Sequence, residues 1–250
     1  MTEQKDYSKA IIVLGILLAI GMASAAFILG VQAKRAVAGQ QSITVKGLAE
    51  KPVSADKAEW TVTVGVVADT QAAALELLVE ERKVLEAFLI KQGLGKETWM
   101  MGVETLHTHY EEIFINNRSR QVPKGFDALQ DIHITSKDLA KITTANKAFL
   151  QLRAQNHPVS SRRPKYLVSN LESVKMSLIA DATKNARTRA TEFVRQDGAK
   201  VGVMKSARQG AFYILPVGGE ANDDHYGGTY DKSTIDKTAR VVVTIVYNIK

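Results

Sequence analysis

The sequence contains no cysteine. Without cysteine the chain can form no disulfide framework, no thiol nucleophile and no Cys-ligated zinc site. A G-x-S-x-G nucleophile motif is also missing. GLGKET, at residues 93–98, lacks the first glycine of a phosphate-binding loop. The sequence therefore predicts no catalytic residue, no bound cofactor and no enzymatic activity.

A second absence is the lack of any charged residue between Lys9 and Lys34. Residues 10–31 are apolar and would span about 33 Å as a helix, enough to cross the hydrocarbon part of a bilayer. The apolar core of a secretory signal is shorter, and it follows a clearly basic segment. We therefore expect a retained transmembrane signal anchor at 10–31, preceded by residues 1–9 and followed by a linker at 32–40.

Cleavage is the alternative, because Ala36-Val37-Ala38 has the small-x-small pattern of a signal peptidase site. Cleavage there would release a soluble periplasmic protein. The position beyond Lys34 and Arg35 makes this site awkward for the peptidase. Since Lys5 and Lys9 precede the apolar run and two cations follow it, charge alone does not orient the helix.

The formal net charge of +7 is unevenly spread. Residues 151–210 contain twelve Lys and Arg against four acids, whereas residues 69–112 and 220–236 are acidic. A basic surface of this kind suits a second copy of the chain, anionic lipid or another envelope component, although a solvated helix face is the simpler alternative. Nucleic acid is not expected, because the last helix lacks aromatic stacking residues. The candidate basic residues are Arg162, Arg163, Lys165, Lys184, Arg187 and Arg195.

The rest of the chain alternates between strand and helix patterns. Helices are predicted at 71–93, 138–156 and 171–196, and the strand pair 98–115 and 126–136 forms a hairpin with a long exposed loop. The fold class is α+β, with a mainly antiparallel sheet packed with three helices and preceded by the transmembrane helix. Residues 216–237, rich in Gly, Asp and Asn, are predicted to be a mobile loop. Further strands are predicted at 42–50, 57–68, 164–169, 201–215 and 238–250.

The last predicted helix carries a narrow stripe of small residues. Ala182, Ala186 and Ala190 lie four residues apart, and Leu178 and the pair Phe193/Val194 extend the stripe. Such a stripe suits close packing on a sheet or another helix.

A weak candidate metal site lies on the predicted hairpin. His107 and His109 are two residues apart and would share one face of a strand, with Glu111 next along that face. His133 on the partner strand could approach them. Two imidazoles and a carboxylate suit zinc or copper, although strand surfaces often carry such residues without a ligand.

Several segments in order resemble the SIMPL domain family. They are ITVKGLAEKPVSADKAEWTVTVGV, GFDALQDIHIT, LIADATKNARTRATEFVRQDGAKVG and VVVTIVYNI, and the resemblance covers residues 41–250. Ala55 stands before Asp56 where Pro-Asp is common in the family. The resemblance implies an α+β fold, often a large homo-oligomer, and export to the bacterial envelope. It also implies a poorly defined function sometimes linked to stress, and no catalytic residues carry over.

With what the resemblance implies, these observations predict a single-pass protein of the bacterial inner membrane that has no enzymatic activity. Residues 1–9 are expected in the cytoplasm, and the domain, residues 41–250, is expected in the periplasm, where it self-assembles. Two alternatives remain at this point. One is a metal-dependent envelope enzyme using His107, His109 and Glu111. The other is an accessory protein that binds anionic envelope components through its basic residues.

Overall fold

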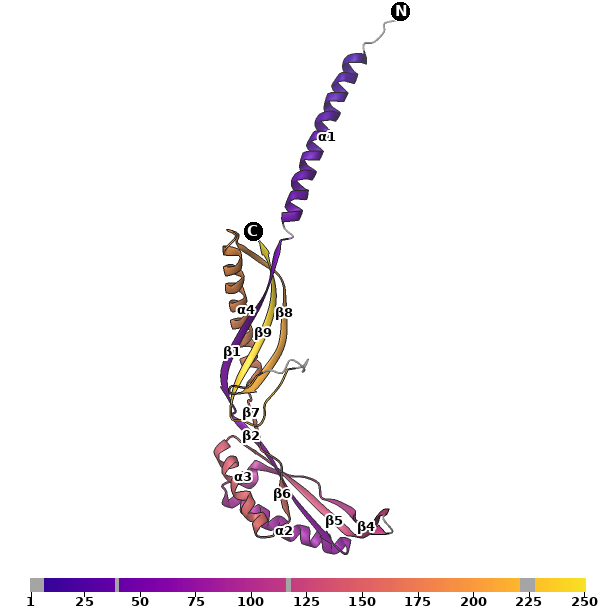
Figure 1. Ribbon diagram of the computed structural model, residues 1–250, viewed down its shortest axis with the longest axis vertical. Helices are drawn as coiled ribbons and strands as arrows, with labels where there is room; N and C mark the ends of the chain where they lie inside the picture. The colour runs from indigo at the N-terminus through magenta and orange to yellow at the C-terminus, as the bar shows by residue number, and fades with distance from the viewer. Residues whose placement is uncertain (1–6, 39–40, 116–117, 221–227) are drawn as a thin grey trace, which may run out of the picture. The chain divides into compact units, whose positions relative to one another are not determined.

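The computed structural model describes residues 7–38, 41–115, 118–220 and 228–250 and confirms the α+β class (Figure 1). The chain divides into two compact units. Unit 1 comprises residues 1–49, 177–210 and 241–250, and unit 2 comprises residues 50–176 and 211–240. The sequence predicts one domain over 41–250, and this division into two units, each discontinuous in the chain, is a finding of the structure.

The apolar N-terminal segment forms the helix α1, Tyr7–Ala38. Its stretch Ile11–Gln32 is long and apolar enough to cross a membrane, and none of it is buried. This agrees with the predicted span at 10–31. The helix continues through the predicted linker at 32–40 as far as Ala38, because Gln, Ala, Lys and Arg all favour helix and extend one that has already formed.

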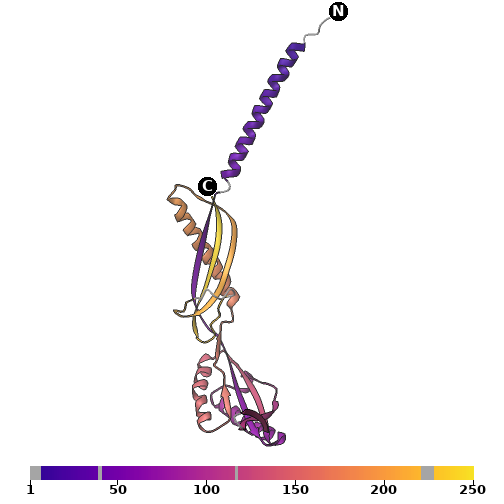
Figure 2. The ribbon, with the colours of Figure 1, turned by 45° about the vertical axis from the view of Figure 1, so that its right-hand side comes forward.

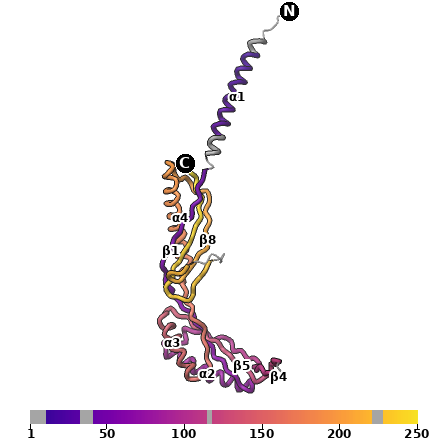
Figure 3. The backbone as a smooth tube through the Cα atoms, in the orientation of Figure 1, coloured from indigo at the N-terminus to yellow at the C-terminus, as the bar shows by residue number. Residues whose placement is uncertain are grey.

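The three-stranded sheet has the order β1 (Ser42–Ser54), β9 (Asp236–Ile249), β8 (Val201–Pro216). Helix α4, Leu171–Arg195, lies along one face of it (Figures 1 and 2). The Ile249 N–H donates to the Gln41 carbonyl at 3.0 Å, and Lys200 and Lys250 exchange backbone hydrogen bonds of 2.7 and 2.8 Å. The C-terminus therefore lies beside the beginning of β1, as Figure 3 shows.

The small-residue stripe of α4 packs directly on β1. Leu178, Ala182, Ala186 and Ala190 have no exposed surface. A Cβ atom placed on Gly47 of β1 would lie 2.0 Å from the Ala182 carbonyl oxygen and 2.7 Å from the Ala186 Cβ. The helix and the strand thus approach so closely that only glycine fits at position 47. Phe193, which the sequence placed on this stripe beside Val194, is instead 64% exposed.

Unit 2 contains an antiparallel sheet with the order β3 (Trp99–Met101), β5 (Arg118–Ser136), β2 (Lys57–Ala68), β6 (Val159–Ser161). Strand β4 (Thr105–Ile115) pairs with β5, and β7 (Lys165–Leu167) pairs with β2. A 3-10 turn, Lys96–Thr98, precedes β3. Helices α2 (Gln71–Lys91) and α3 (Leu139–Ala154) cover one face of this sheet (Figures 1 and 2).

An aromatic cluster fills the core between the helices and this sheet. The Trp60 ring of β2 meets Phe149 of α3 edge to face at 5.5 Å, and Phe88 of α2 meets Phe149 at 6.0 Å. The indole N–H of Trp60 donates to the Arg162 carbonyl at 3.0 Å. The Trp60 ring is thus buried while its indole N–H keeps a hydrogen-bond acceptor, as a buried tryptophan requires.

One predicted loop is shorter in the structure, and another is tied to the fold by contacts near its end. Strand β5 begins at Arg118, and its pairing with β4 continues through the polar segment. The prediction of a long exposed loop before residue 126 is therefore wrong for residues 118–125. In the predicted mobile loop 216–237, Ile235 packs against the hydrophobic core, and the Tyr230 hydroxyl accepts a hydrogen bond from the Val168 N–H at 2.8 Å. Residues 221–227 lie outside the described residues.

Candidate functional site

The three candidate metal ligands, His107, His109 and Glu111, lie on β4, and the last two contact different partners. His109 Nδ1 lies 3.0 Å from Asp127 Oδ1, and the Glu111 carboxylate pairs with Lys124. The register of β4 against β5 shifts between Thr108 and Tyr110, which interrupts the regular pairing on which the prediction rests. Within the ranges that the structure describes, no group of three or more His, Asp or Glu side chains is placed to hold a metal ion.

His107 on β4 and His133 on β5 line the same open cavity, but they lie at distant positions along this pair of strands. His107 pairs with Asp127, whereas His133 is six residues further along that strand, about 20 Å at the usual rise. His133 Nδ1 lies 3.2 Å from the Thr61 hydroxyl of β2. The structure therefore brings neither His133 to His107 nor a third ligand to His109.

The six candidate basic residues are all exposed but belong to two units. Arg162, Arg163 and Lys165 lie in unit 2, and Lys184, Arg187 and Arg195 lie on α4 in unit 1. The Arg187 guanidinium lies over the Tyr247 ring, 5.7 Å from its centroid. Arg195 pairs with Glu192 at 3.0 Å. Each group of three is thus a separate surface in its own unit.

A buried ion pair in unit 2 was not anticipated from the sequence. Lys237, at the start of β9, has no exposed surface, and its ammonium donates to Asp231 Oδ2 at 3.1 Å and to the Thr234 carbonyl. Asp231 also accepts from the Ser233 N–H at 2.9 Å and from the Ser233 hydroxyl at 2.6 Å. A buried lysine is tolerated here because its charge is paired and its hydrogen bonds are made.

The same contacts set the protonation of the carboxylate. Burial by itself raises the pKa of Asp231, but the hydrogen bonds from Ser233, Thr234 and Lys237 outweigh it and hold that pKa far below its usual value. Asp231 is therefore charged throughout the physiological range. The cluster ties the segment before β9 to the strand itself, which is a structural role.

A second polar cluster joins α2 to the sheet of unit 2. The Arg82 guanidinium donates to Glu104 Oε1 at 2.6 Å and to Gln130 Oε1 at 2.9 Å. The buried Gln130 in turn donates to the Gly102 carbonyl at 2.9 Å. These groups make their hydrogen bonds with one another. The cluster therefore has a structural role, which is to hold α2 on the sheet.

The two edges of the three-stranded sheet differ. On β1, the Leu48 N–H donates to Asn185 Oδ1 at 3.2 Å, and the Lys46 carbonyl accepts from the Arg189 guanidinium at 3.2 Å. The Gln41 carbonyl faces β9, and the direction of the backbone N–H and C=O groups alternates along a strand. The even-numbered residues of β1 therefore direct these groups away from β9. Side chains of α4 thus cap the outer edge of β1.

The other edge strand of the sheet, β8, is exposed over much of its length among the residues that the structure describes. Every residue from Val203 to Gly210 is exposed, and Val203 exposes 61% of its surface. Only the far end is covered, where Ile214 N–H donates to the Thr229 carbonyl at 2.7 Å. The sheet therefore has one capped edge and one open edge.

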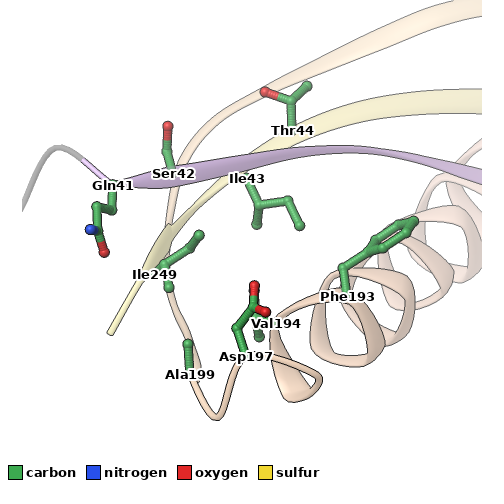
Figure 4. A pocket seen from close by; sticks show the side chains of 9 residues that line it. All are labelled: Gln41, Ser42, Ile43, Thr44, Phe193, Val194, Asp197, Ala199 and Ile249. Atoms are coloured by element: carbon green, nitrogen blue, oxygen red, sulfur yellow. The ribbon is translucent and has the colours of Figure 1, made fainter.

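An open groove of about 800 Å³ lies in unit 1 beside the start of β1. Ile43 of β1, Ile249 of β9 and Val194 of α4 line it, and Phe193 stands at its side (Figure 4). The rest of the lining is polar, because Gln41, Ser42 and Thr44 contribute to it and Asp197, from the turn after α4, adds a charged carboxylate (Figure 4). Its residues come from three parts of the sequence, so no local motif predicts it.

These features define an α+β protein of two compact units that carries an N-terminal apolar helix long enough to span a membrane. The family model described as "SIMPL: Protein of unknown function (DUF541)" matches residues 43–247, and the chain belongs to this family. No curated protein matches the sequence.

Proposed function

We propose that the protein is a non-enzymatic component of the bacterial envelope, held in the inner membrane by α1, whose SIMPL domain assembles with copies of itself in the periplasm. A role in the stress response belongs to the same proposal and rests on the family resemblance alone. The observation that carries the proposal is the open edge of β8.

An open edge exposes unpaired backbone N–H and C=O groups that accept the strand of another chain. The capping of β1 by Asn185 and Arg189 directs such pairing to β8. The exposed Val203 and Met204 add apolar surface on this strand. The edge also carries Arg208, so an acidic surface of a second copy complements it.

The anchor supports assembly by confining copies to one plane. Tethering raises the effective concentration of the domains, so weak edge contacts suffice. The apolar helix buries none of its residues in the protein, and lipid is the environment that suits it. The periplasmic placement rests on the family resemblance, because the cations on the two sides of the span balance.

The test is light scattering coupled to size exclusion on the full-length protein in detergent. We expect a mass that is a multiple of the chain mass. Val203→Lys places an additional charge on the open edge and is expected to shift the protein toward the monomer. Leu150→Lys on α3 is the matched control, because Leu150 is exposed to 65% against 61% for Val203.

A monomeric wild-type protein at micromolar concentration contradicts the proposal. If the wild type assembles and the two variants behave alike, assembly stands but does not use β8.

A further inference from the structure

We propose that the groove beside the start of β1 is a membrane-contact surface, which rests on the bilayer into which α1 inserts. The occupant of the groove is the headgroup and upper acyl region of the lipid. This inference depends on the anchor in the proposed function, but not on self-assembly.

The length of the chain limits how far the groove can be from the membrane. The apolar stretch ends at Gln32, α1 continues to Ala38, and β1 begins at Ser42. The six helical residues 33–38 rise about 9 Å, and each residue after Ala38 adds at most about 3.5 Å. Gln41 therefore lies within about 20 Å of the hydrocarbon edge and Ile43 within about 26 Å, and the headgroup layer fills the first 5–8 Å of this distance, roughly.

The composition of the groove suits that layer. Phe193 is 64% exposed, whereas Leu178 and Val194 on the same helix are buried. Ile43 and Ile249 are half-buried and line the same hollow. An aromatic ring beside aliphatic side chains is the apolar part of an interfacial contact, which inserts a few ångström into the boundary between headgroups and acyl chains.

Charged groups surround this apolar part as a membrane surface requires. Lys200 and Lys250 are exposed and share backbone hydrogen bonds at the same end of the sheet. Lys34 and Arg35 lie in the chain just after the apolar span, and residues 32–41 contain no acid. Such cations attract anionic headgroups, while Asp197 in the groove remains hydrated among them.

A second copy is the competing occupant of an apolar groove. The short tether favours lipid, because the bilayer is always within reach of the groove whereas a second copy must diffuse to it. The two occupants differ in a measurable way, since lipid dissolves oxygen and excludes polar reagents, whereas a protein interface excludes both.

The absence of native cysteine makes single-site labelling direct. Phe193→Cys, Asp181→Cys and Leu17→Cys are each labelled with a nitroxide in the full-length protein. Each is reconstituted at high lipid excess into vesicles of phosphatidylcholine and phosphatidylglycerol. Collision rates with molecular oxygen and with a neutral nickel chelate are then measured by electron paramagnetic resonance.

We expect the ratio of oxygen to nickel collisions at residue 193 to shift from the value at Asp181, an exposed position on the same helix, toward the value at Leu17 in the span. A companion probe at Thr44, which also lines the groove, is expected to lose its shift when Phe193 is replaced by Ser. Because Phe193 is exposed, this replacement leaves the fold intact, and circular dichroism verifies it.

A lipid signal at residue 17 with a water signal at residue 193 overturns this inference and leaves the anchor standing. Shielding of residue 193 from both reagents also overturns it, in favour of a protein contact. A water signal at residue 17 removes the anchor itself, and this inference with it.

Discussion

At the scale of single residues, Lys237 pairs with Asp231 and has no exposed surface. Removing one partner leaves the other charge buried and unpaired, which typically costs about 3–5 kcal/mol. Lys237→Met is therefore expected to lower the free energy of unfolding by about that amount in urea denaturation. Lys165→Met, at an exposed position, is the control and is expected to change it little.

The acid sensitivity of the fold depends on the other member of the pair. The pKa of Asp231 is lower in the folded chain than in the unfolded chain, so its contribution is present above the ordinary value of about 4 and is lost as the pH falls below it. We expect Asp231→Asn to flatten the fall in stability between pH 5 and pH 2. Unfolding free energies over this range measure it, with the exposed Glu76→Gln as control. Parallel curves for Asp231→Asn and the wild type would contradict the assignment.

Ala55 departs from the proline that is common at this point in the family, and the structure gives a reason. The Ala55 N–H donates to the Ile235 carbonyl at 2.9 Å, a bond that proline cannot make. Ala55→Pro is expected to lower the free energy of unfolding by about 1–3 kcal/mol. Ala55→Ser retains the N–H and is the control in the same thermal or urea experiment. Equal stability of the Pro and Ser variants would show that this bond contributes nothing.

At the scale of elements, the contact between β1 and α4 tolerates no side chain at position 47. Gly47→Ala places a carbon 2.0 Å from a backbone oxygen, so the helix must move away from the strand. Overpacking of this kind costs about 1–3 kcal/mol. The control is Gly65→Ala on β2, where the nearest atom is the end of the flexible Leu129 side chain at 3.3 Å. Urea denaturation of both variants measures the difference, and equal loss of stability would contradict the close contact.

Most elements follow from local patterns in the sequence. Alternation identifies β2 and β9, and the helical spacing of the alanines identifies both α4 and its packing face. The boundaries of α2 follow from its cap, where Thr70 accepts from the Ala73 N–H at 3.2 Å. These are signals within about twenty residues, which is the range over which hydrophobic periodicity operates.

The features that sequence patterns missed depend on contacts between distant segments. The groove joins Ile43 to Phe193 and Ile249. Lys237 and Asp231 are close in sequence, but the glycine- and aspartate-rich surroundings suggest a solvated loop, and only the fold shows their burial. The metal hypothesis treats β4 as a regular strand, and the register shift after Thr108 is not visible in its composition. The division into two units has no signal, since the boundaries fall inside strands and α4.

At the scale of the whole molecule, α1 is expected to contribute localisation but no fold stability. None of its apolar stretch is buried in the protein. A chain of residues 41–250 is therefore expected to unfold at the same temperature as the full-length protein in detergent. Circular dichroism during heating measures it, and membrane flotation of both forms is the companion experiment. A marked drop in the melting temperature would show that α1 packs on the domain.

Unit 1 takes its parts from both ends of the chain. Its first strand begins at Ser42, and its last residues are 241–250. During synthesis β1 therefore emerges long before its partners β9 and α4, and it has to remain unpaired until almost the whole chain has been made. Unit 2 also waits, because residues 211–240 belong to it. The closing of both units is thus a late event, and until then β1 is an exposed strand on which a chaperone can act.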